Sequence, residues 1–264
     1  MNPKDLNNFI TELIVQQVAH AGTTTEYRQP LVGFASAKDP RFHQLRSIVE
    51  PTHFLPEDML PGASSVVSFF LPFAGWVVEA NAQHRYQVAR EWPTAYLETN
   101  ALINRITGLL INALTKHGIR SAAAPATHNY DPISLICRWS HKSVAVIAGL
   151  GSFGLHRMVI TEAGCAGRFG SLVVECDLEV TQVAAKERCL YFFDGSCHEC
   201  VSRCPVDALT MDGSLDKQCC NRRLIGLAKL HGSDSPADAC GKCAIGPCSL
   251  ESAVPDQGIL TSIA

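Results

Sequence analysis

The sequence lacks several features that mark common classes of protein. Its formal net charge is only −3 and it has no long basic run, so we do not expect nucleic acid as a partner. No apolar stretch is long enough to span a membrane. The first ten residues are polar and lack the basic start and apolar centre of a signal peptide. A G-x4-G-K-[ST] phosphate-binding motif is also absent. These absences predict a cytoplasmic protein that makes no membrane contact and is not an ATP-driven activator.

The chain is nevertheless long enough for a sizeable core, because 47% of its 264 residues are hydrophobic. Apolar spacing predicts helices over residues 5–20 and 94–117, and short strands over residues 31–35, 64–71 and 171–175. Residues 134–148 fit a helix, or a helix followed by a strand. After Asp177, cysteine replaces aliphatic residues as the organising residue type. We therefore predict an α/β domain over 1–180 and a cysteine-rich domain over 181–264.

The cysteines are the most informative residues of the chain. Nine of the twelve fall between Cys189 and Cys248. Structural disulfides are disfavoured in a reducing compartment, and such crowding favours metal ligation. The core motif is Cys197-His-Glu-Cys200-Val-Ser-Arg-Cys204-Pro205, a C-x2-C-x3-C-P run. This run is typical of proteins that bind 4Fe–4S clusters.

In bacterial two-cluster ferredoxins, the last cysteine of such a run ligates the other cluster. The same logic predicts two 4Fe–4S clusters with crossed ligands. The first cluster would use Cys189, Cys197, Cys200 and Cys248, and the second Cys204, Cys220, Cys240 and Cys243.

Two alternatives accompany this ligand prediction. Tetrahedral zinc sites are the main one, but the C-P signature and the absence of paired zinc-ribbon knuckles favour clusters. The second concerns Cys219 and Cys220, which compete for one ligand position, so one of the two is a bystander.

A glycine-rich segment precedes the cysteines. An apolar run over 144–148 leads into Gly149-Leu-Gly151-Ser-Phe-Gly154, which mimics a strand followed by the dinucleotide fingerprint G-x-G-x-x-G. That fingerprint requires a helix directly after the glycines, whereas residues 155–170 are β-branched and glycine-rich. We therefore favour a backbone that approaches another large cofactor. The candidate contacts are Gly149, Gly151, Gly154, Cys165 and Gly167.

These segments together carry a family resemblance. The stretch from Ala148 to Gly154, the later strand Gly170-Ser-Leu-Val-Val-Glu175 and the cysteine array resemble epoxyqueuosine reductases, and corrinoid reductive dehalogenases have a similar segment. Asp58-Met-Leu-Pro-Gly62 and the long helix before Gly118 are also similar. The resemblance extends from about residue 55 to residue 250.

The resemblance implies an α+β protein, in which a nitroreductase-like α/β core that binds cobalamin is followed by a ferredoxin-like two-cluster domain. It implies base-off cobalamin without a protein histidine ligand. It also implies an external electron donor, such as ferredoxin or flavodoxin, and a small organic substrate to be reduced. Asp131 or Tyr130 would supply a proton, although Asp131-Pro132 is also a common turn sequence. The alternative is an electron-transfer or corrinoid-handling protein that has no substrate chemistry of its own.

Overall fold

The computed structural model describes residues 2–127, 129–182, 186–230 and 237–255, and a four-stranded antiparallel sheet lies at its centre. The strand order is β1-β2-β6-β3, and every neighbouring pair is antiparallel. The strands are β1 (Leu31–Ser36), β2 (Ser65–Pro72), β3 (Ser121–Ala123) and β6 (Gly167–Val174). The sequence-based strand predictions over 31–35, 64–71 and 171–175 are therefore confirmed, while β3 was not predicted.

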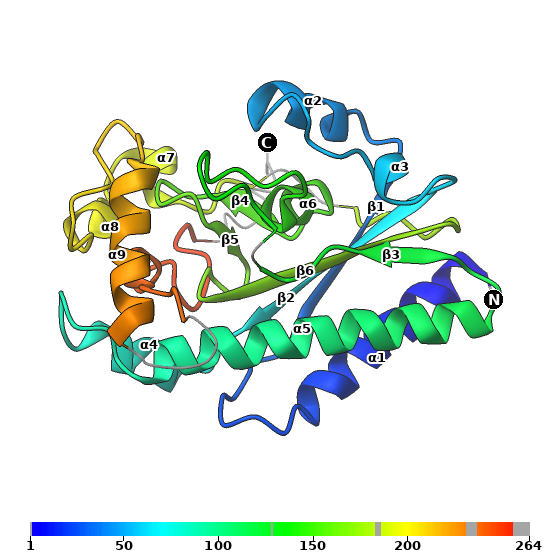
Figure 1. Cartoon of the computed structure of the whole chain (residues 1–264), viewed down its shortest axis with the longest axis horizontal. Coiled ribbons are helices and arrows are strands. Elements are labelled where there is room, and N and C mark those ends of the chain that lie inside the picture. Colours follow the sequence, from blue (N-terminus) through cyan, green and yellow to red (C-terminus); the bar gives the residue numbers. More distant parts are fainter. Residues whose placement is uncertain (1, 128, 183–185, 231–236, 256–264) are drawn as a thin grey trace, which may run out of the picture.

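Two helices cover one face of the sheet, α1 (Pro3–Ala19) and α5 (Glu91–Lys116), as Figure 1 shows. Alternate strand residues such as Val67 and Leu172 pack against Ile10 and Ile106 of these helices in one hydrophobic cluster. The apolar stripe predicted over 94–117 is thus core packing, except that Leu109 is 38% exposed.

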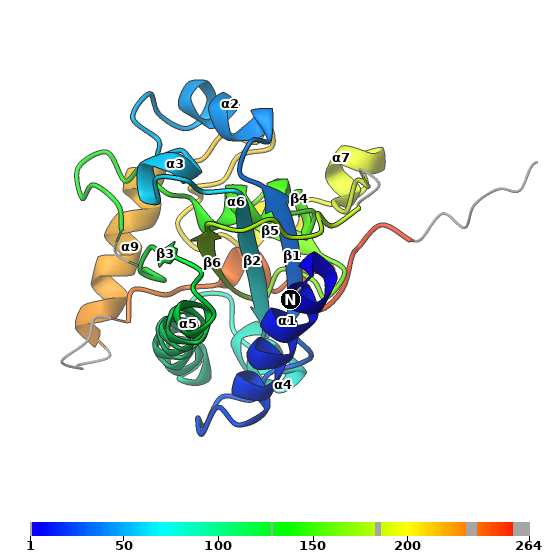
Figure 2. The same cartoon turned by 90° about the vertical axis from the view of Figure 1, so that its right-hand side faces the viewer.

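Shorter elements cover the opposite face (Figure 2). They are α2 (Pro40–Ile48), α3 (Pro56–Met59), α6 (His141–Ile147) and the hairpin formed by β4 (Gly151–Phe153) and β5 (Val159–Thr161). The other set of alternate residues, including Val66 and Val173, packs against Val144 of α6. Because β2 is covered on both faces, all eight of its residues are buried, which explains its continuous apolar run.

Of the two alternatives for residues 134–148, the structure shows the helix without a strand after it. Residues 144–147 belong to helix α6, and the glycines lead into a hairpin. The sequence left both open because a short apolar run does not by itself distinguish a buried strand from a buried helix. The arrangement agrees with the rejection of a dinucleotide fingerprint, because that fingerprint needs a strand before its glycines and a helix after them.

The cysteine-rich segments gather at one end of the sheet, beside the start of α5 (Figure 1). They comprise α7 (Leu190–Asp194), α8 (Glu199–Ser202), α9 (Lys217–Leu230) and the 3-10 turn η1 (Lys242–Ala244), and α4 (Gly75–Ala82) lies near them. Phe73 and Trp92 share one hydrophobic cluster with Ala239 and Ala244. The two predicted domains therefore pack directly on one another, and the boundary near residue 180 stays a prediction.

The chain finally returns to the α/β layer. Arg28 donates hydrogen bonds to the carbonyl oxygens of Leu250 at 2.7 Å and Ala163 at 2.8 Å, which ties the returning segment to the glycine-rich loop. Within the part of the chain that the structure describes, no helix combines the length and the apolar character that crossing a bilayer would require.

Candidate functional site

The structure gathers four cysteines that we call the first quartet. The chain reverses between Cys189 and Cys197 because Gly195 ends α7 with a φ of 76° and the Asp194 carboxylate accepts a hydrogen bond from Ser196 N at 2.9 Å. Burial, together with the sulfurs of the other members, raises the pKa of the Cys200 thiol to about 12. The first quartet is Cys189, Cys197, Cys200 and Cys248.

A second quartet lies beside it. Pro205 follows Cys204 and prevents α8, which ends at Ser202, from continuing, and Cys204 Sγ accepts a hydrogen bond from Ala208 N at 3.2 Å. Burial, followed by the neighbouring sulfurs, raises the pKa values of Cys220 and Cys243. The second quartet is Cys204, Cys220, Cys240 and Cys243.

The two sets match the crossed sets predicted from the sequence, although their role as ligands remains a prediction. Each quartet offers buried thiols whose ionisation needs a compensating cation. Cys200 of the first quartet also contributes to the raised pKa of Cys243 in the second, so the two sets adjoin.

The spacing of the sulfurs favours clusters over single zinc ions. Four thiolates at about 2.3 Å from one zinc ion would lie about 3.8 Å from one another. Among the described residues, neither quartet has three sulfur atoms within 4.8 Å of one another. The wider spacing suits ligands that surround a group of several irons.

The two adjacent cysteines of α9, Cys219 and Cys220, have different surroundings in the structure. Cys219 donates its thiol hydrogen to the carbonyl oxygen of Val206 at 3.4 Å. Cys220 instead lines the cavities described below and lies near the sulfurs of Cys204 and Cys240. This placement favours Cys220 as the candidate ligand, and the choice between the two cysteines stays a prediction.

Two adjoining cavities, of about 460 and 350 Å³, lie between the α/β layer and the cysteine-rich segments. Their volumes are those of small-molecule or cofactor sites. Apolar side chains such as Met158 and Leu224 form much of the walls. The residues that line both cavities are Tyr96, Lys142, Met158, Gly167, Arg168, Leu215, Cys220, Leu224 and Asp238.

Arg168 is the unusual group in these walls. Its guanidinium lies 4.3 Å from the ring centre of Tyr96, and burial lowers its pKa. Its buried Nε atom has no hydrogen-bond partner among the described residues. A buried donor without a partner carries a free-energy penalty that an acceptor on a bound ligand would relieve. The cavities therefore suit a large ligand with an apolar body and polar acceptors.

Two histidines border the cavities, and both ring nitrogens of each are engaged within the protein. His141 Nε2 lies 3.0 Å from the Pro125 carbonyl oxygen and Nδ1 lies 2.7 Å from Ser171 Oγ. His156 Nδ1 accepts from Met158 N, and Nε2 lies 3.2 Å from Cys248 Sγ. Both rings are therefore held by contacts within the protein.

The predicted proton donors occupy different positions. Tyr130 lines the larger cavity, and burial followed by the nearby Asp238 raises its pKa. Asp131 is exposed, and its Oδ1 accepts hydrogen bonds from Ile133 N and from Ser134 N and Oγ. Asp131 lines neither cavity in this structure, and its hydrogen bonds are those of a turn. Both residues stay predictions as proton donors, and Tyr130 is the one that borders a cavity.

The predicted cofactor-binding glycines serve mainly close internal packing. Gly149 ends α6 with a φ of 80°, and Gly151 packs against the backbone of Ile160, where a Cβ would lie 2.1 Å from the carbonyl oxygen. A Cβ on Gly154 would lie 2.8 Å from His156 Cε1. None of these three lines the two cavities, whereas Gly167 lines both and Cys165 lines the smaller.

Several side chains that contact a quartet or a cavity, Arg168 among them, were not singled out from the sequence. His156 and Arg223 contact quartet sulfurs, and Arg223 Nε donates to Cys240 Sγ at 3.1 Å. Asp238 lines both cavities. No local spacing signals these roles, because each depends on contacts between distant segments.

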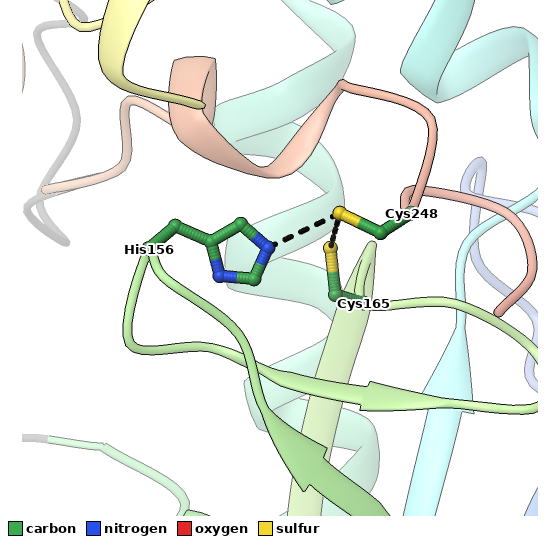
Figure 3. Close-up of side chains that lie close together, drawn as sticks. All are labelled: His156, Cys165 and Cys248. Atoms are coloured by element: carbon green, nitrogen blue, oxygen red, sulfur yellow. Dashed lines mark hydrogen bonds between the residues drawn. The ribbon is translucent and has the colours of Figure 1, made fainter. Parts of the chain in front are cut away.

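Cys248 has two close neighbours, shown in Figure 3. His156 Nε2 lies 3.2 Å and Cys165 Sγ lies 3.9 Å from Cys248 Sγ. The hydrogen bond with Cys165 lowers the pKa of Cys248 and raises that of Cys165, so Cys248 is the member of the pair that ionises first. This arrangement stabilises Cys248 as a thiolate.

Comparisons with known proteins agree with the resemblance. No family model matches the chain. Epoxyqueuosine reductases from Vibrio cholerae and Aliivibrio fischeri are 25% and 27% identical to it over 166 and 170 residues. These matches cover 62% of this chain, which spans 42% of the length of each relative.

Solved structures with a similar fold include a Bacillus subtilis epoxyqueuosine reductase with its catalytic aspartate loop swung out of the active site. It has 19% identity and a TM-score of 0.57, and the match covers 94% of this chain and 68% of that one. An epoxyqueuosine reductase with an epoxyqueuosine-modified tRNA stem loop has 21% identity and a TM-score of 0.56, with 92% and 66% covered. A catabolic reductive dehalogenase has 16% identity and a TM-score of 0.61, with 96% and 33% covered. The resemblance expected from the sequence is thereby confirmed: this chain is similar in sequence to epoxyqueuosine reductases and shares a fold with them and with a reductive dehalogenase.

Proposed function

We propose that the protein is an iron–sulfur reductase that holds a 4Fe–4S cluster in each cysteine quartet and a corrinoid in the two adjoining cavities. The observation that carries this proposal is the position of the second quartet. All four of its cysteines line the smaller cavity, and Cys220 lines both. A cluster at this quartet would therefore lie at the wall of the cofactor site.

The residues present fit these groups. When bound, the clusters supply one-electron transfer and the corrinoid supplies a reducible cobalt centre. Arg168 Nε would donate to an acceptor at the corrin periphery, and Met158 and Leu224 would exclude water from one wall. Tyr130 would hold a proton on its phenol oxygen, since its raised pKa keeps it protonated at neutral pH.

The substrate class expected from the sequence needs revision. A small organic substrate was expected and nucleic acid was not, yet one structural neighbour carries an epoxyqueuosine-modified tRNA stem loop. We therefore include a modified tRNA stem loop among the candidate substrates, beside small halogenated or epoxide compounds. An external donor such as ferredoxin or flavodoxin would supply the electrons.

One observation favours the alternative of an electron-transfer or corrinoid-handling protein. The Asp131 carboxylate is engaged in its own turn and faces neither cavity, so the described residues offer no carboxylate from this loop as a proton donor. In this alternative, clusters and corrinoid bind and no substrate is turned over.

The first experiment is metal analysis of anaerobically purified protein, before and after incubation with cobalamin, together with an absorption spectrum. We expect about eight irons per chain, as two cubane clusters require, and about one cobalt after incubation. Zinc in place of iron would overturn the cluster assignment. Iron without any cobalt uptake would overturn the corrinoid assignment.

A pair of variants tests the cavity itself. Arg168→Met removes the unpartnered donor and should weaken cobalamin binding while the iron content stays unchanged. Arg120→Met is the matched control, because Arg120 is exposed and pairs with Glu175 away from the cavities. Equal cobalamin affinity in both variants would place the corrinoid elsewhere. Incubation of the loaded protein with each candidate substrate and a reductant, followed by mass spectrometry, then separates the reductase from the electron carrier.

A further inference from the structure

The hydrogen-bond partners of His156 fix where its ring carries a hydrogen. The backbone N–H of Met158 points at His156 Nδ1 at 3.0 Å. Because Met158 N is a donor, Nδ1 must be the acceptor and carries no hydrogen. The neutral ring therefore carries its hydrogen on Nε2, which lies 3.2 Å from Cys248 Sγ (Figure 3). His156 is thus a defined N–H donor to a cysteine of the first quartet.

Cys165 is a weaker second neighbour of the same sulfur. Its Sγ lies 3.9 Å from Cys248 Sγ and also 3.8 Å from the carbonyl oxygen of Ala244. A thiol has one hydrogen, so Cys165 shares it between two acceptors. His156 Nε2 has a single acceptor among the described residues, so His156 is the better defined donor to Cys248.

Two glycines allow the close packing around His156: Gly154 packs against the imidazole ring, and Gly164 packs against the returning chain segment. A Cβ on Gly154 would lie 2.8 Å from His156 Cε1, so only glycine leaves room for the ring at this position. Gly164, with a φ of +76°, lies against the backbone of Ser249, where a Cβ would be 2.2 Å from the carbonyl oxygen. The backbone N–H of the next residue, Cys165, then donates to the Cys248 carbonyl oxygen at 2.9 Å. The glycine-rich segment thereby presents the histidine to the returning segment of the chain.

We propose that His156 is a positioning residue that raises the reduction potential of the first-quartet cluster by donating its Nε2 hydrogen to Cys248 Sγ; this rests on the proposed cluster in that quartet. Hydrogen bonds to cluster sulfurs are among the factors that set the potential. Reduction adds negative charge to the cluster and its sulfurs, so the N–H donor stabilises the reduced state more than the oxidised state. The buried position of His156, 5% exposed, strengthens the effect because water does not compete for the sulfur.

The test compares three variants of the full, cluster-loaded protein. His156→Phe removes the donor, and His156→Gln retains an N–H donor on a flexible side chain. The matched control is His53→Gln, because His53 is also buried and engaged at both ring nitrogens but contacts no cysteine sulfur among the described residues. The readouts are iron content and a redox titration followed by electron paramagnetic resonance.

We expect His156→Phe to lower one of the two midpoint potentials by about a tenfold change in the one-electron equilibrium, about 59 mV, and to leave the other unchanged. His156→Gln should recover part of that shift, and His53→Gln should change neither potential. Iron content should stay the same in all three. Unchanged potentials in a fully loaded His156→Phe protein would overturn the inference.

Two further outcomes keep the inference separable from the proposed function. Unmutated protein without iron–sulfur signals would overturn the proposed clusters and with them the role of His156, whereas unchanged midpoints in loaded His156→Phe protein would overturn that role alone. If His156→Phe assembles poorly, Gly154→Ala provides a second variant, since it keeps the imidazole but displaces the ring. It should shift the same midpoint in the same direction, and an unchanged midpoint in Gly154→Ala would also overturn the inference.

Discussion

The two cysteine quartets have the same ligand chemistry but different surroundings. At the first, the imidazole of His156 faces Cys248, and Leu155, Leu190 and the acidic Glu199 line the same pocket. The second is contacted by a cation, since the Arg223 guanidinium donates to Cys240 Sγ at 3.1 Å. A charged donor stabilises added negative charge more strongly than a neutral one. We therefore expect the second cluster, which borders the cavities, to have the higher reduction potential, an order that favours electron transfer toward the cavities.

The largest expected effect on iron content comes from the removal of one candidate ligand from each quartet. Cys200→Ala and Cys243→Ala should each lower the iron content from about eight to about four per chain, because each leaves one site with three thiolates. The two variants should lose different signals in electron paramagnetic resonance.

The control for these variants is Cys176→Ala, because Cys176 packs against the α/β core away from both quartets. It should keep all the iron. If Cys200→Ala or Cys243→Ala also keeps all the iron, the crossed ligand sets are wrong.

The second quartet is also the more sensitive to packing. Gly241, between Cys240 and Lys242, has a φ of +68° and lies against the Trp92 ring, where a Cβ would be 1.9 Å from a ring carbon. Gly241→Ala combines left-handed strain with an overlap that the buried indole cannot relieve, so we expect a loss of about 2–4 kcal/mol in the free energy of unfolding. Thermal unfolding of the loaded protein provides the measurement.

Substitutions at two other glycines distinguish the effect of left-handed backbone strain from that of steric overlap with a neighbouring side chain. Gly195, near the first quartet, has a φ of +76°, but no atom lies within 4 Å of the position that a Cβ would occupy there. Gly195→Ala should therefore lose only about 1 kcal/mol in the free energy of unfolding. Gly226 lies within α9 with open space around it, so Gly226→Ala should stabilise the helix by about 0.5–1 kcal/mol. Equal effects at Gly241 and Gly195 would show that Trp92 does not constrain the loop.

The charge difference between the quartets predicts a smaller, purely electronic effect. Arg223→Met should lower the midpoint potential of the second cluster, and by more than His156→Phe lowers that of the first, because the lost donor carries a full charge. Arg222→Met is the matched control, since the Arg222 side chain next to it in sequence is exposed. A redox titration in which Arg223→Met leaves both midpoints unchanged would remove the proposed order of potentials.

Sequence patterns predict those features of the fold and of the candidate site that depend on local residue spacing. The apolar stripe of α5 follows from residues three and four apart, and the quartets follow from the C-x2-C-x3-C-P run together with ferredoxin logic. In both cases the signal lies within a short segment or in a known ligand pattern. The sheet order and the antiparallel pairing carry no such signal.

The surroundings of the quartets depend on contacts between distant residues. His156 and Cys248 are 92 positions apart, and they meet because Gly164 allows two loops to approach closely. Asp131 is a second example, since an aspartate before proline suits either a turn or catalysis, and only the structure reveals its hydrogen bonds with Ser134. Residue type alone does not choose between such roles.

The smallest expected effect concerns the pair of cysteines in α9. Successive residues of a helix point about 100° apart, so only one of Cys219 and Cys220 faces the second quartet. Cys219 donates to the Val206 carbonyl oxygen at 3.4 Å, and a serine hydroxyl at the same position can donate to that oxygen as well. Cys219→Ser should therefore keep all the iron, both midpoint potentials and the stability within about 0.5 kcal/mol. Cys220→Ser, one position further along the helix, should lose the second cluster. Loss of iron in Cys219→Ser with full retention in Cys220→Ser would reverse the assignment and would require the helix to present its other face to the quartet.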